Sequence, residues 1–533
     1  MSSSFKFSHI SPVYHFMSEK SNSFAKNVSG FALASLITKI LGYARDSLLV
    51  ACFGGGALTD AYYAAFRLVN IFRRTVGEGA INASFIPMLE KERAKSEENA
   101  KAFFSSVWTL IICASAILAL SGILLRRPLV RFFTGGFAAN PEQLALTALL
   151  TAILMPHLVF VNAAALLQAA LNSARRFFAP ALAPAVFSLS IIACLFLLRA
   201  GFTASLSPAY KITILAAVAS ASGLAQLAIL APMMLKEGYC LRLSAPGRAL
   251  NGTQALAFAL PAAAALAQDQ LSMLINTVYA SFLAPGSITA IYNAARIVQF
   301  PVSLFAASAA AVSLPELSRI TAGSGEKGGS SATLELAFKT TALILLPAAI
   351  GLVFLSLPIS RALFEHGRFT YEQSAVTSRA ILFLALGLPA FGINKVAVSA
   401  FYGAGKNMLP VKVVFFQLCA NALLGFPLMR AMGLQGLMLA TSVSSWGAAV
   451  FLLLRLEKAT GFTAFGDTGV FFKIAAATAA MGLAVLAGKF SFEGFLGPIA
   501  LTALCVAIGL AVYFLALKAL GCEDRKLVTR GMF

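Results

Sequence analysis

Apolar residues fill this chain in long runs that are separated by short polar segments. A run of about 20 apolar residues can cross the hydrocarbon core of a bilayer as a helix. On that criterion the pattern predicts an all-α polytopic membrane protein with about fourteen transmembrane helices. These helices are expected at 29–52, 58–89, 102–125, 143–172, 179–199, 210–235, 253–283, 287–317, 333–357, 373–402, 408–430, 433–456, 469–489 and 495–519. An even number of spans places both ends of the chain on one side of the membrane.

Basic residues are unevenly divided between the two sets of loops. KERAKSEENAK (91–101), KEGYCLRLSAPGR (236–248) and the tail CEDRKLVTR (522–530) lie on the side of the chain ends. The opposite loops, such as FGGGALT (53–59), carry fewer basic residues, with LRRPLVRFF (125–133) as an exception. Because short cytoplasmic loops hold the excess of Lys and Arg, both termini are predicted to be cytoplasmic.

The chain contains an internal repeat. ALTDAYYAAFRLVNIF from Ala57 matches SITAIYNAARIVQFPVSLF from Ser287, with Tyr62 on Tyr292 and Arg67 near Arg296, and FIPML (85–89) falls on SLPEL (313–317). A shift of about 230 residues covers an even number of spans, so the pattern predicts two six-helix lobes as parallel repeats about an axis along the membrane normal. In such transporters the substrate site lies at the repeat interface.

This organisation predicts five segments. They are a polar cytoplasmic tail at 1–27, an N-terminal lobe at 28–236, a C-terminal lobe at 237–458, two further C-terminal helices at 459–520, and a cytoplasmic tail at 521–533. The first segment is Ser-rich and has no long apolar core, so it does not resemble a cleaved signal peptide.

Composition supports a membrane location and excludes several other classes. The chain is 59% hydrophobic and only 12% charged, whereas a soluble domain is about 25% charged. The net charge of +20 lies mostly between the apolar runs, as topology signals do, so no nucleic-acid partner is expected. The seven cysteines form no CxxC pair and the four histidines are scattered, which indicates neither a disulfide framework nor a metal site.

Several charged residues nevertheless fall inside the predicted spans. Asp60, Arg67 and Arg74 are spaced by seven, with Glu78 four residues later, so they lie along one stripe of a helix. The other charges of interest are Arg73, beside Arg74, and Lys39, Arg45, Asp46, Asp269 and Arg296. Ion pairs between helices, or side chains reaching to the interface, are the alternative explanation and suit Arg45 and Asp46. A charge at the centre of a membrane helix costs about 2.5–3.5 kcal/mol, so the repeated occurrence favours a water-filled cavity.

Basic side chains outnumber acidic ones in this set. An exporter of cations would present acidic residues to its ligand, whereas the guanidinium group binds phosphate in a bidentate manner. The predicted ligand is therefore an anion, most naturally a phosphate or pyrophosphate. The predicted substrate-binding residues are Lys39, Arg45, Arg73, Arg74 and Arg296. The predicted orienting or gating residues are Asp46, Asp60, Arg67, Glu78 and Asp269.

No motif for catalysis or for nucleotide hydrolysis is present. H-E-x-x-H and G-x-S-x-G are absent from the sequence, and GSGEKGGSS (323–331) lacks the G-K-[ST] ending of a phosphate-binding loop. The chain is therefore predicted to be a transporter that needs no cofactor. The energy for transport would come from the membrane potential or from an ion gradient.

Four motifs stand out in chain order: ITKILGYARDSLLVACFG, TDAYYAAFRLVNIFRRTVGEGAINASFIPML, INTVYASFLAPGSITAIYNAARIVQFP and LFEHGRFT. With them the chain resembles the MurJ (MviN) family of bacterial lipid II flippases, from about residue 28 to 520. The resemblance implies the multidrug/oligosaccharidyl-lipid/polysaccharide (MOP) transporter fold, in which two lobes meet in a V and two C-terminal helices form a groove for a polyprenyl tail. It also implies roles in the cavity for Lys39, Arg45, Asp60, Arg73 and Arg296, with Arg74 and Glu78 in the same block. Lys39 stands where an Arg is usual, and Ala295 where an acidic residue is common.

The function implied by this resemblance is alternating access for lipid II in the bacterial inner membrane. The pyrophosphate and the disaccharide-pentapeptide headgroup would occupy the cavity while the undecaprenyl tail stays among membrane lipids. Two alternatives remain: a related flippase for another polyprenyl-linked glycan or amphiphilic anion, and a scaffold that binds other cell-wall synthesis proteins. The scaffold leaves the buried arginines unexplained. A membrane glycosyltransferase is disfavoured because the acidic residues are few and scattered.

Overall fold

The computed structural model describes residues 33–73, 85–199, 205–243, 270–303, 327–404, 408–460 and 468–522, and these residues form helices joined by turns and loops, with no β-strand among them. A helix over residues 33–53 comes first. It is followed by α2 (Ala57–Phe72), α3 (Ile86–Arg93), α4 (Glu97–Leu124), α5 (Arg126–Phe133), the 3₁₀ helix η2 (Gly135–Ala139), α6 (Pro141–Leu154), α7 (His157–Ser173), α8 (Phe178–Arg199) and α9 (Pro208–Lys236).

The second half of the chain has a similar order of long and short helices. A helix over residues 270–280 leads into α11 (Ser287–Pro301), α13 (Lys327–Phe354), α14 (Ser356–Phe364), α15 (Tyr371–Ala385), α16 (Leu388–Gly403), α17 (Met408–Met432) and α18 (Leu434–Thr460). Two C-terminal helices, α19 (Thr468–Phe492) and α20 (Pro498–Ala519), complete the described chain.

Several helices begin at a Ser or Asn residue whose side chain caps the helix N-terminus. The Ser96 hydroxyl accepts the N–H of Asn99 at the start of α4 (3.1 Å), and Asn140 caps α6 immediately before a proline. Ser207 caps α9 in the same way, again with a proline at the first helical position. These side chains satisfy N–H groups that have no partner inside the helix, and proline at the first position removes one of them.

Within the described residues, nine helices are long and apolar enough to cross a membrane, or ten if the pair α15 and α16, bent by 46°, counts as one span. Ten of the expected windows coincide with these spans. The other four, at 29–52, 58–89, 253–283 and 287–317, include residues outside the described ranges. The all-helical multi-span class is confirmed, and the total of about fourteen remains a prediction. The window at 373–402 was expected to be one continuous helix, whereas the structure breaks it where Pro389 lacks the N–H to continue the α15 pattern.

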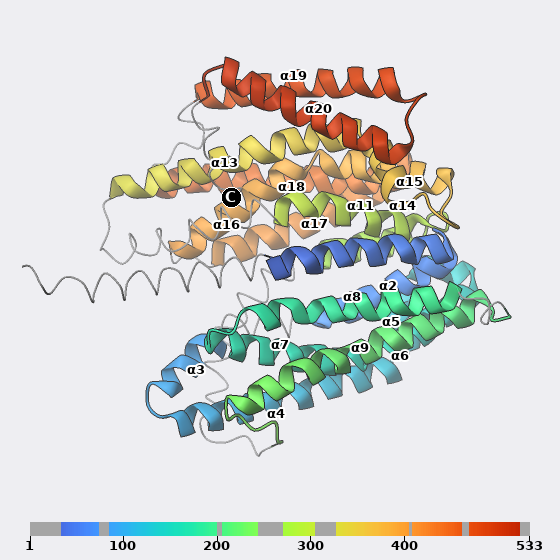
Figure 1. Ribbon diagram of the computed structural model, residues 1–533, viewed down its shortest axis with the longest axis vertical. Coiled ribbons are helices and arrows are strands. Elements are labelled where there is room, and N and C mark those ends of the chain that lie inside the picture. The colour runs from blue at the N-terminus through green and yellow to red at the C-terminus, as the bar shows by residue number, and fades with distance from the viewer. Residues whose placement is uncertain are drawn as a thin grey trace, which may run out of the picture.

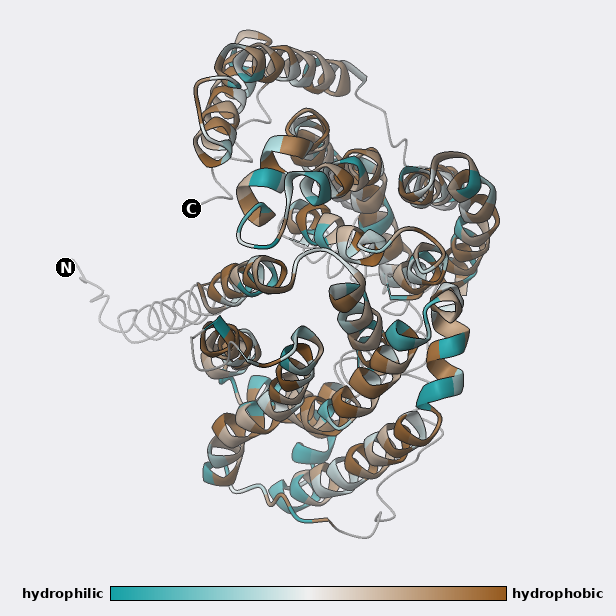
Figure 2. Ribbon diagram, turned by 90° about the vertical axis from the view of Figure 1, so that its right-hand side faces the viewer, coloured by the Kyte–Doolittle hydropathy of each residue, from teal (hydrophilic) through white to brown (hydrophobic). Residues whose placement is uncertain are grey.

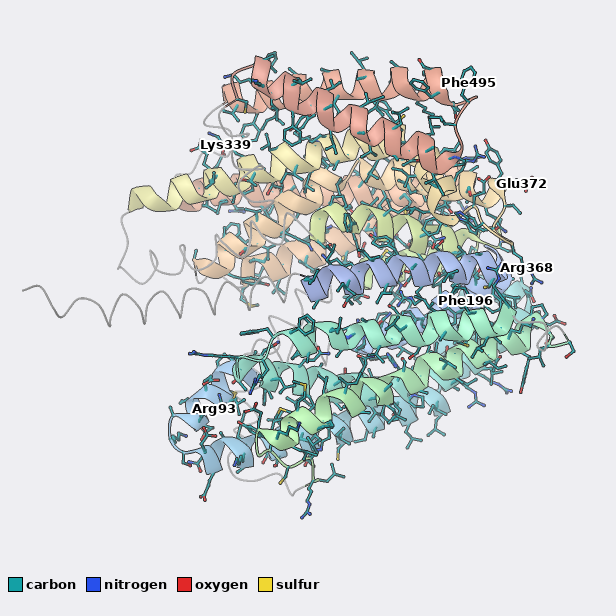
Figure 3. All side chains as sticks on the ribbon, in the orientation of Figure 1. Arg93, Phe196, Lys339, Arg368, Glu372 and Phe495 are labelled. Atoms are coloured by element: carbon teal, nitrogen blue, oxygen red, sulfur yellow. The ribbon has the colours of Figure 1, made fainter. Side chains whose placement is uncertain are left out.

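The long helices run in one general direction and their polar connections gather at two ends (Figure 1). Arg93 and Lys339 lie at one end, and Arg368 and Glu372 lie at the other (Figure 3). We call these the Arg93 end and the Arg368 end. Viewed from the Arg368 end, most residues of the long helices are hydrophobic (Figure 2). Large apolar side chains such as Leu423 and Phe472 are about three-quarters exposed, which suits contact with lipid (76% and 75%).

The two halves share one apolar core. The helices from residue 33 to α9 form one half, and those from residue 270 to α18 form the other (Figure 1). One cluster of buried side chains contains residues from both, for example Leu150 and Ile212 from the first half and Phe364 and Leu437 from the second. Beyond the second half, α19 packs on α13 and α20 packs on α14 through a separate cluster that includes Cys505. The halves are therefore packed against each other, and the C-terminal pair packs on the second half.

Candidate functional site

A cavity of about 470 Å³ lies between the two halves. Its walls come from the helix over 33–53, α2, α7, α8 and α9 in the first half, and from the helix over 270–280 and α11 in the second. The basic residues that line it are Lys39, Arg45, Arg67, Arg73 and Arg296. Among the described residues that line this cavity, none is acidic. The field inside is therefore positive, which suits an anionic ligand.

Asp46 joins two of these arginines from behind the cavity wall. Its Oδ1 accepts the Nε–H of Arg45 at 2.8 Å, and its Oδ2 accepts the Nε–H of Arg296 at 2.8 Å. Asp46 and Arg45 are buried, whereas the side chain of Arg296 is 39% exposed. The two arginines come from different halves, so one carboxylate fixes both guanidinium groups across the boundary.

Two further bonds join the helix over 33–53 to the second half. The Tyr43 hydroxyl donates to the carbonyl oxygen of Arg296 at 2.7 Å. The Lys39 ammonium donates to the Ser303 hydroxyl at 3.3 Å. Together with the Asp46–Arg296 pair, these bonds follow one face of the helix over successive turns. The helix that carries Lys39 is therefore attached to the opposite half along its cavity-facing side.

Aromatic rings support the guanidinium groups. The Tyr292 ring lies under two of them, with Arg67 at 5.6 Å and Arg296 at 5.9 Å from its centroid. Tyr292 in turn stacks on Tyr63 of the first half, at a centroid distance of 4.0 Å. Arg45 lies 5.0 Å from the Phe187 centroid. An aromatic face attracts a cation, so these rings hold the charged groups in place without neutralising them.

The cavity wall also carries neutral polar groups among its apolar residues. Amide side chains from both halves line it: Asn70, Gln168, Gln226, Gln270 and Gln299. The buried imidazole of His157 also lines it, and its Nδ1 has no hydrogen-bond partner within the described residues. A second cavity of about 320 Å³ adjoins the first and shares Thr38, Lys39, Gln168 and Pro184 with it. The cavity thus combines a cationic cluster with a surface of neutral donors and acceptors.

Asp60 lies elsewhere on α2, at the contact between the halves. Its carboxylate accepts the N–H of Gly286 at 2.6 Å, the N–H of Thr289 at 2.8 Å and the hydroxyl of Thr289 at 2.6 Å. Gly286 is the N-cap of α11 and Thr289 is in its first turn. Asp60 therefore caps a helix of the other half, where the unpaired N–H groups and the helix dipole favour an anion.

The comparisons with known proteins agree on one family. The family model described as lipid II flippase MurJ matches residues 49–506. The lipid II flippase MurJ of Burkholderia cenocepacia is 30% identical over 511 residues, which cover 93% of this chain and 96% of that protein. The chain belongs to the MurJ family of lipid II flippases. A solved MurJ in an inward closed conformation is 25% identical, with a TM-score of 0.76 over 93% of this chain and 99% of that one. An inward-facing MATE transporter of the MOP superfamily shares the fold alone, at 15% identity and a TM-score of 0.64 over 82% and 99% of the two chains.

This member of the MurJ family is a multi-pass membrane protein, and the structure brings together the predicted basic residues that it describes. Lys39, Arg45, Arg73 and Arg296, expected to bind substrate, and Arg67, expected to orient them, all line one cavity. Arg73 also donates its Nε–H to Asn70 at 2.9 Å. Arg74, Glu78 and Asp269 lie outside the described residues, so their roles remain predictions.

Two features differ from what the sequence suggested. Ala295 stands where the family often has an acid, yet Arg296 has a carboxylate partner, because Asp46 reaches it from the other half. Tyr292, Phe187 and His157 also line the cavity, although the sequence did not predict them there. In the sequence, Tyr292 stood out only as the match of Tyr62 in the internal repeat. A single aromatic residue in an apolar span carries no signal that distinguishes a cavity-lining residue from a core residue.

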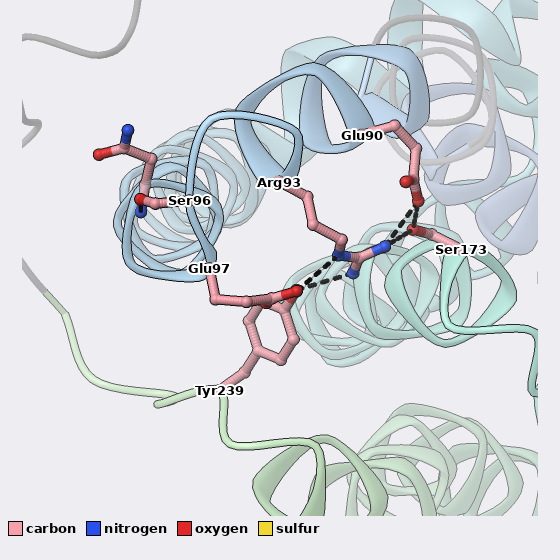
Figure 4. A network of polar contacts seen from close by, with 7 residues as sticks. Glu90, Arg93, Ser96, Glu97, Ser173 and Tyr239 are labelled. Carbon is pink, nitrogen blue, oxygen red and sulfur yellow. Dashed lines mark hydrogen bonds and ion pairs between the residues drawn. The ribbon is translucent and has the colours of Figure 1, made fainter.

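A polar network at the Arg93 end lies apart from the cavity (Figure 4). The Arg93 guanidinium donates to Glu90 at 2.7 Å, to Ser173 at 3.0 Å and to the Tyr239 hydroxyl at 2.9 Å. These partners belong to α3, to the end of α7 and to the segment after α9. The network therefore ties three segments of the first half together. Within the described ranges, no group of three or more His, Cys, Asp or Glu side chains could hold a metal ion.

Proposed function

We propose that this chain moves lipid II from the cytoplasmic to the outer leaflet of the bacterial inner membrane by alternating access. The observation that carries the proposal is the cavity between the halves, which five basic side chains line and to which the described residues contribute no acid. Pyrophosphate is the strongest anion of this substrate, and guanidinium groups match it with paired N–H donors. The protein acts as a transporter and not as an enzyme.

Arg296 is the residue best placed to meet the pyrophosphate first. Its side chain is 39% exposed, and its Nε–H is taken by Asp46. A guanidinium has five N–H donors, so the group has further donors to present to an anion. Arg45 is buried beside it and adds charge from behind. Lys39 and Arg73 would add contacts from neighbouring walls of the same cavity.

The neutral wall suits the rest of the headgroup. Sugars and peptides carry many hydroxyl and amide groups, which bind amide side chains such as Gln168 and Gln226 through hydrogen bonds. The adjoining cavity of about 320 Å³ enlarges this neutral region beside Lys39. The polyprenyl tail would remain in lipid, and the α19–α20 pair, which packs outside the second half, is the proposed groove for it.

We assign the Arg93 end to the cytoplasmic side, where both termini are expected. The basic segment 91–101 lies at that end, in keeping with the positive-inside rule. In this orientation the Asp60 cap closes the outer side and the cavity lies on its cytoplasmic side. A membrane potential that is negative inside favours outward movement of an anion by about 2.3 kcal/mol per charge per 100 mV. The proposal also allows an ion gradient to add to this driving force and other cell-wall synthesis proteins to bind the chain.

The test is rescue of lipid II externalisation in cells whose own flippase is depleted. The parent chain should restore externalisation, whereas Arg45→Ala and Arg296→Ala should lower it by about tenfold or more, because each removes a charged hydrogen-bonding group worth about 1.5–3 kcal/mol. Externalisation with Arg296→Lys should lie between that of the parent chain and that of Arg296→Ala. Lysine keeps the positive charge but lacks the paired N–H donors of the guanidinium group. Arg430→Ala removes an exposed arginine of α17 that lies against Phe426, and serves as the matched control.

All variants must be compared at equal membrane levels. Rescue by both alanine variants would mean that the basic cavity is not the transport site. If the parent chain fails although it reaches the membrane, the alternative of another polyprenyl-linked glycan or amphiphilic anion is favoured, and loss of surface glycan on depletion would identify it.

A further inference from the structure

Two short elbows meet the opposite half of the protein at the Arg368 end. The first elbow, residues 134–140, joins α5 to α6 and contains η2. The second elbow, residues 365–370, joins α14 to α15. Each elbow belongs to one half, and each touches the end of a helix that belongs to the other half.

The first elbow contacts the second half through its backbone. Gly136 lies so close to Ser281 that a methyl group on it would overlap the Ser281 carbonyl and the following peptide nitrogen. The Gly136 N–H donates to the Ser281 hydroxyl at 3.0 Å. Ser281 is the residue directly after the helix over 270–280, and it is buried. Only a residue without a side chain can make this approach.

The second elbow makes the corresponding contact in the opposite direction. Gly367, with φ of +61°, lies so close to Ala51 that a methyl group would overlap the Ala51 carbonyl oxygen. The next residue, Arg368, donates its backbone N–H to that same oxygen at 2.8 Å. Ala51 is near the end of the helix over 33–53 and is buried.

The two contacts are related by the internal repeat. Ala51 and Ser281 are 230 positions apart, and Gly136 and Gly367 are 231 apart. The residues that lead into the elbows follow the same shift, with Pro128 and Arg131 falling on Pro358 and Arg361. Shortly after the glycines come Phe137 and Phe369, and both are buried in the core cluster that the halves share.

We propose that the two elbows form a reciprocal clasp that holds the Arg368 end closed and opens as one unit in each transport cycle. Each half contributes one elbow to this pair of contacts, so no rigid movement that separates the halves at this end can keep either contact. Because backbone atoms make both contacts, the clasp has two discrete states, in contact or apart, and does not stretch. The inference rests on the proposed alternating access, since only that cycle requires this end to open.

The clasp can be tested without any substrate. Spin labels at Ala138→Cys and Glu372→Cys, both exposed and on opposite halves, report the separation at the Arg368 end by double electron–electron resonance. The full chain is used in membranes, with its seven native cysteines replaced and its externalisation activity checked. Gly136→Ala and Gly367→Ala should each raise the ratio of long to short distances by about tenfold or more, and the double variant should raise it further.

Gly447→Ala is the matched control, because a methyl group there meets nothing within 4 Å and alanine favours the α18 helix. If the glycine variants do not reach the membrane, Ser281→Ala decides the question. It removes the acceptor of the Gly136 N–H without adding bulk, and it should shift the ratio in the same direction by a smaller factor. Distances that stay unchanged in every variant that folds would overturn the clasp. Failure of lipid II rescue by the parent chain would instead count against the proposed function and leave the distance result intact.

Discussion

Replacement of Asp60 by Asn tests whether the boundary between the halves is held by a charge. The carboxylate accepts two backbone N–H groups, from Gly286 and Thr289, and one hydroxyl, all at 2.6–2.8 Å. An Asn side chain has the same shape, but one of its two ends is a donor and would face a donor. Hydrogen bonds to a charged group contribute about 1.5–3 kcal/mol each, and a charge at a partly buried helix terminus adds up to about 2 kcal/mol.

The neutral oxygen of Asn retains part of this energy, so we expect a loss of about 3 kcal/mol. At about 1.4 kcal/mol per factor of ten, the ratio of closed to open molecules at the Arg368 end should fall by about a hundredfold. Asp60 does not line the cavity, so ligand contacts should be unaffected and the defect should be conformational. The labels at positions 138 and 372 measure the ratio, and lipid II externalisation measures the consequence, which should be a clear loss.

Thr289→Val is the matched control for this experiment. It removes the hydroxyl donor but keeps the Thr289 backbone N–H, so its effect should be clearly smaller than that of Asp60→Asn. The reasoning is refuted if Asp60→Asn retains full externalisation with an unchanged distance distribution. A larger effect of Thr289→Val would show that the hydroxyl, and not the helix terminus, dominates the contact.

Two further predictions concern the cavity and the Arg93 end. Lys39→Arg should maintain or increase externalisation, because a guanidinium can grip phosphate with two N–H groups where the ammonium offers a point charge; a decrease would contradict a phosphate contact at Lys39. Arg93→Met should lower the melting temperature by a few degrees, since it removes bonds to Glu90, Ser173 and Tyr239 worth about 1–2 kcal/mol after allowance for the partial exposure of the side chain (23%). Lipid II externalisation by Arg93→Met at low temperature should change little. A large loss of externalisation at low temperature would show that Arg93 has a role in transport and not only in stability.

The helices and the basic cavity could be predicted from sequence because both follow from the bilayer. Lipid offers no partner to a charged group, so arginines such as Arg67 and Arg73 must face the inside of the protein. The same argument applies to Arg296, whereas for Arg45 the sequence also allowed an ion pair with Asp46 or a place near the interface. The bend between α15 and α16 was missed, because average hydropathy does not respond to a change of direction.

Contacts made by backbone atoms could not be predicted in the same way. Asp60 was expected either to orient arginines or to serve at a gate, and its partners in the structure are the N–H groups of Gly286 and Thr289. Every residue except proline has such a group, so nothing in the sequence identifies the partner. The sequence likewise showed no sign of the roles of Gly136 and Gly367, because glycine is common in membrane helices and loops. Only the close approach of another backbone segment explains why these two positions need glycine.

The internal repeat explains why the backbone contacts between the halves are symmetric although the charged residues are not. Thr59 and Thr289, 230 positions apart, touch each other through their hydroxyls at 3.0 Å, as equivalent residues must near a two-fold axis. By the same shift Asp60 falls on Ala290, and Arg45 and Asp46 fall on Ile275 and Asn276. If both copies had kept the charges, two carboxylates would meet near the axis and repel each other. With the second copy diverged, Asp60 faces the start of α11, and Asp46 faces the guanidinium groups of Arg45 and Arg296. In the proposed cycle the repeated backbone provides two halves that part and close, and the unequal side chains confine the basic groups to one cavity between them.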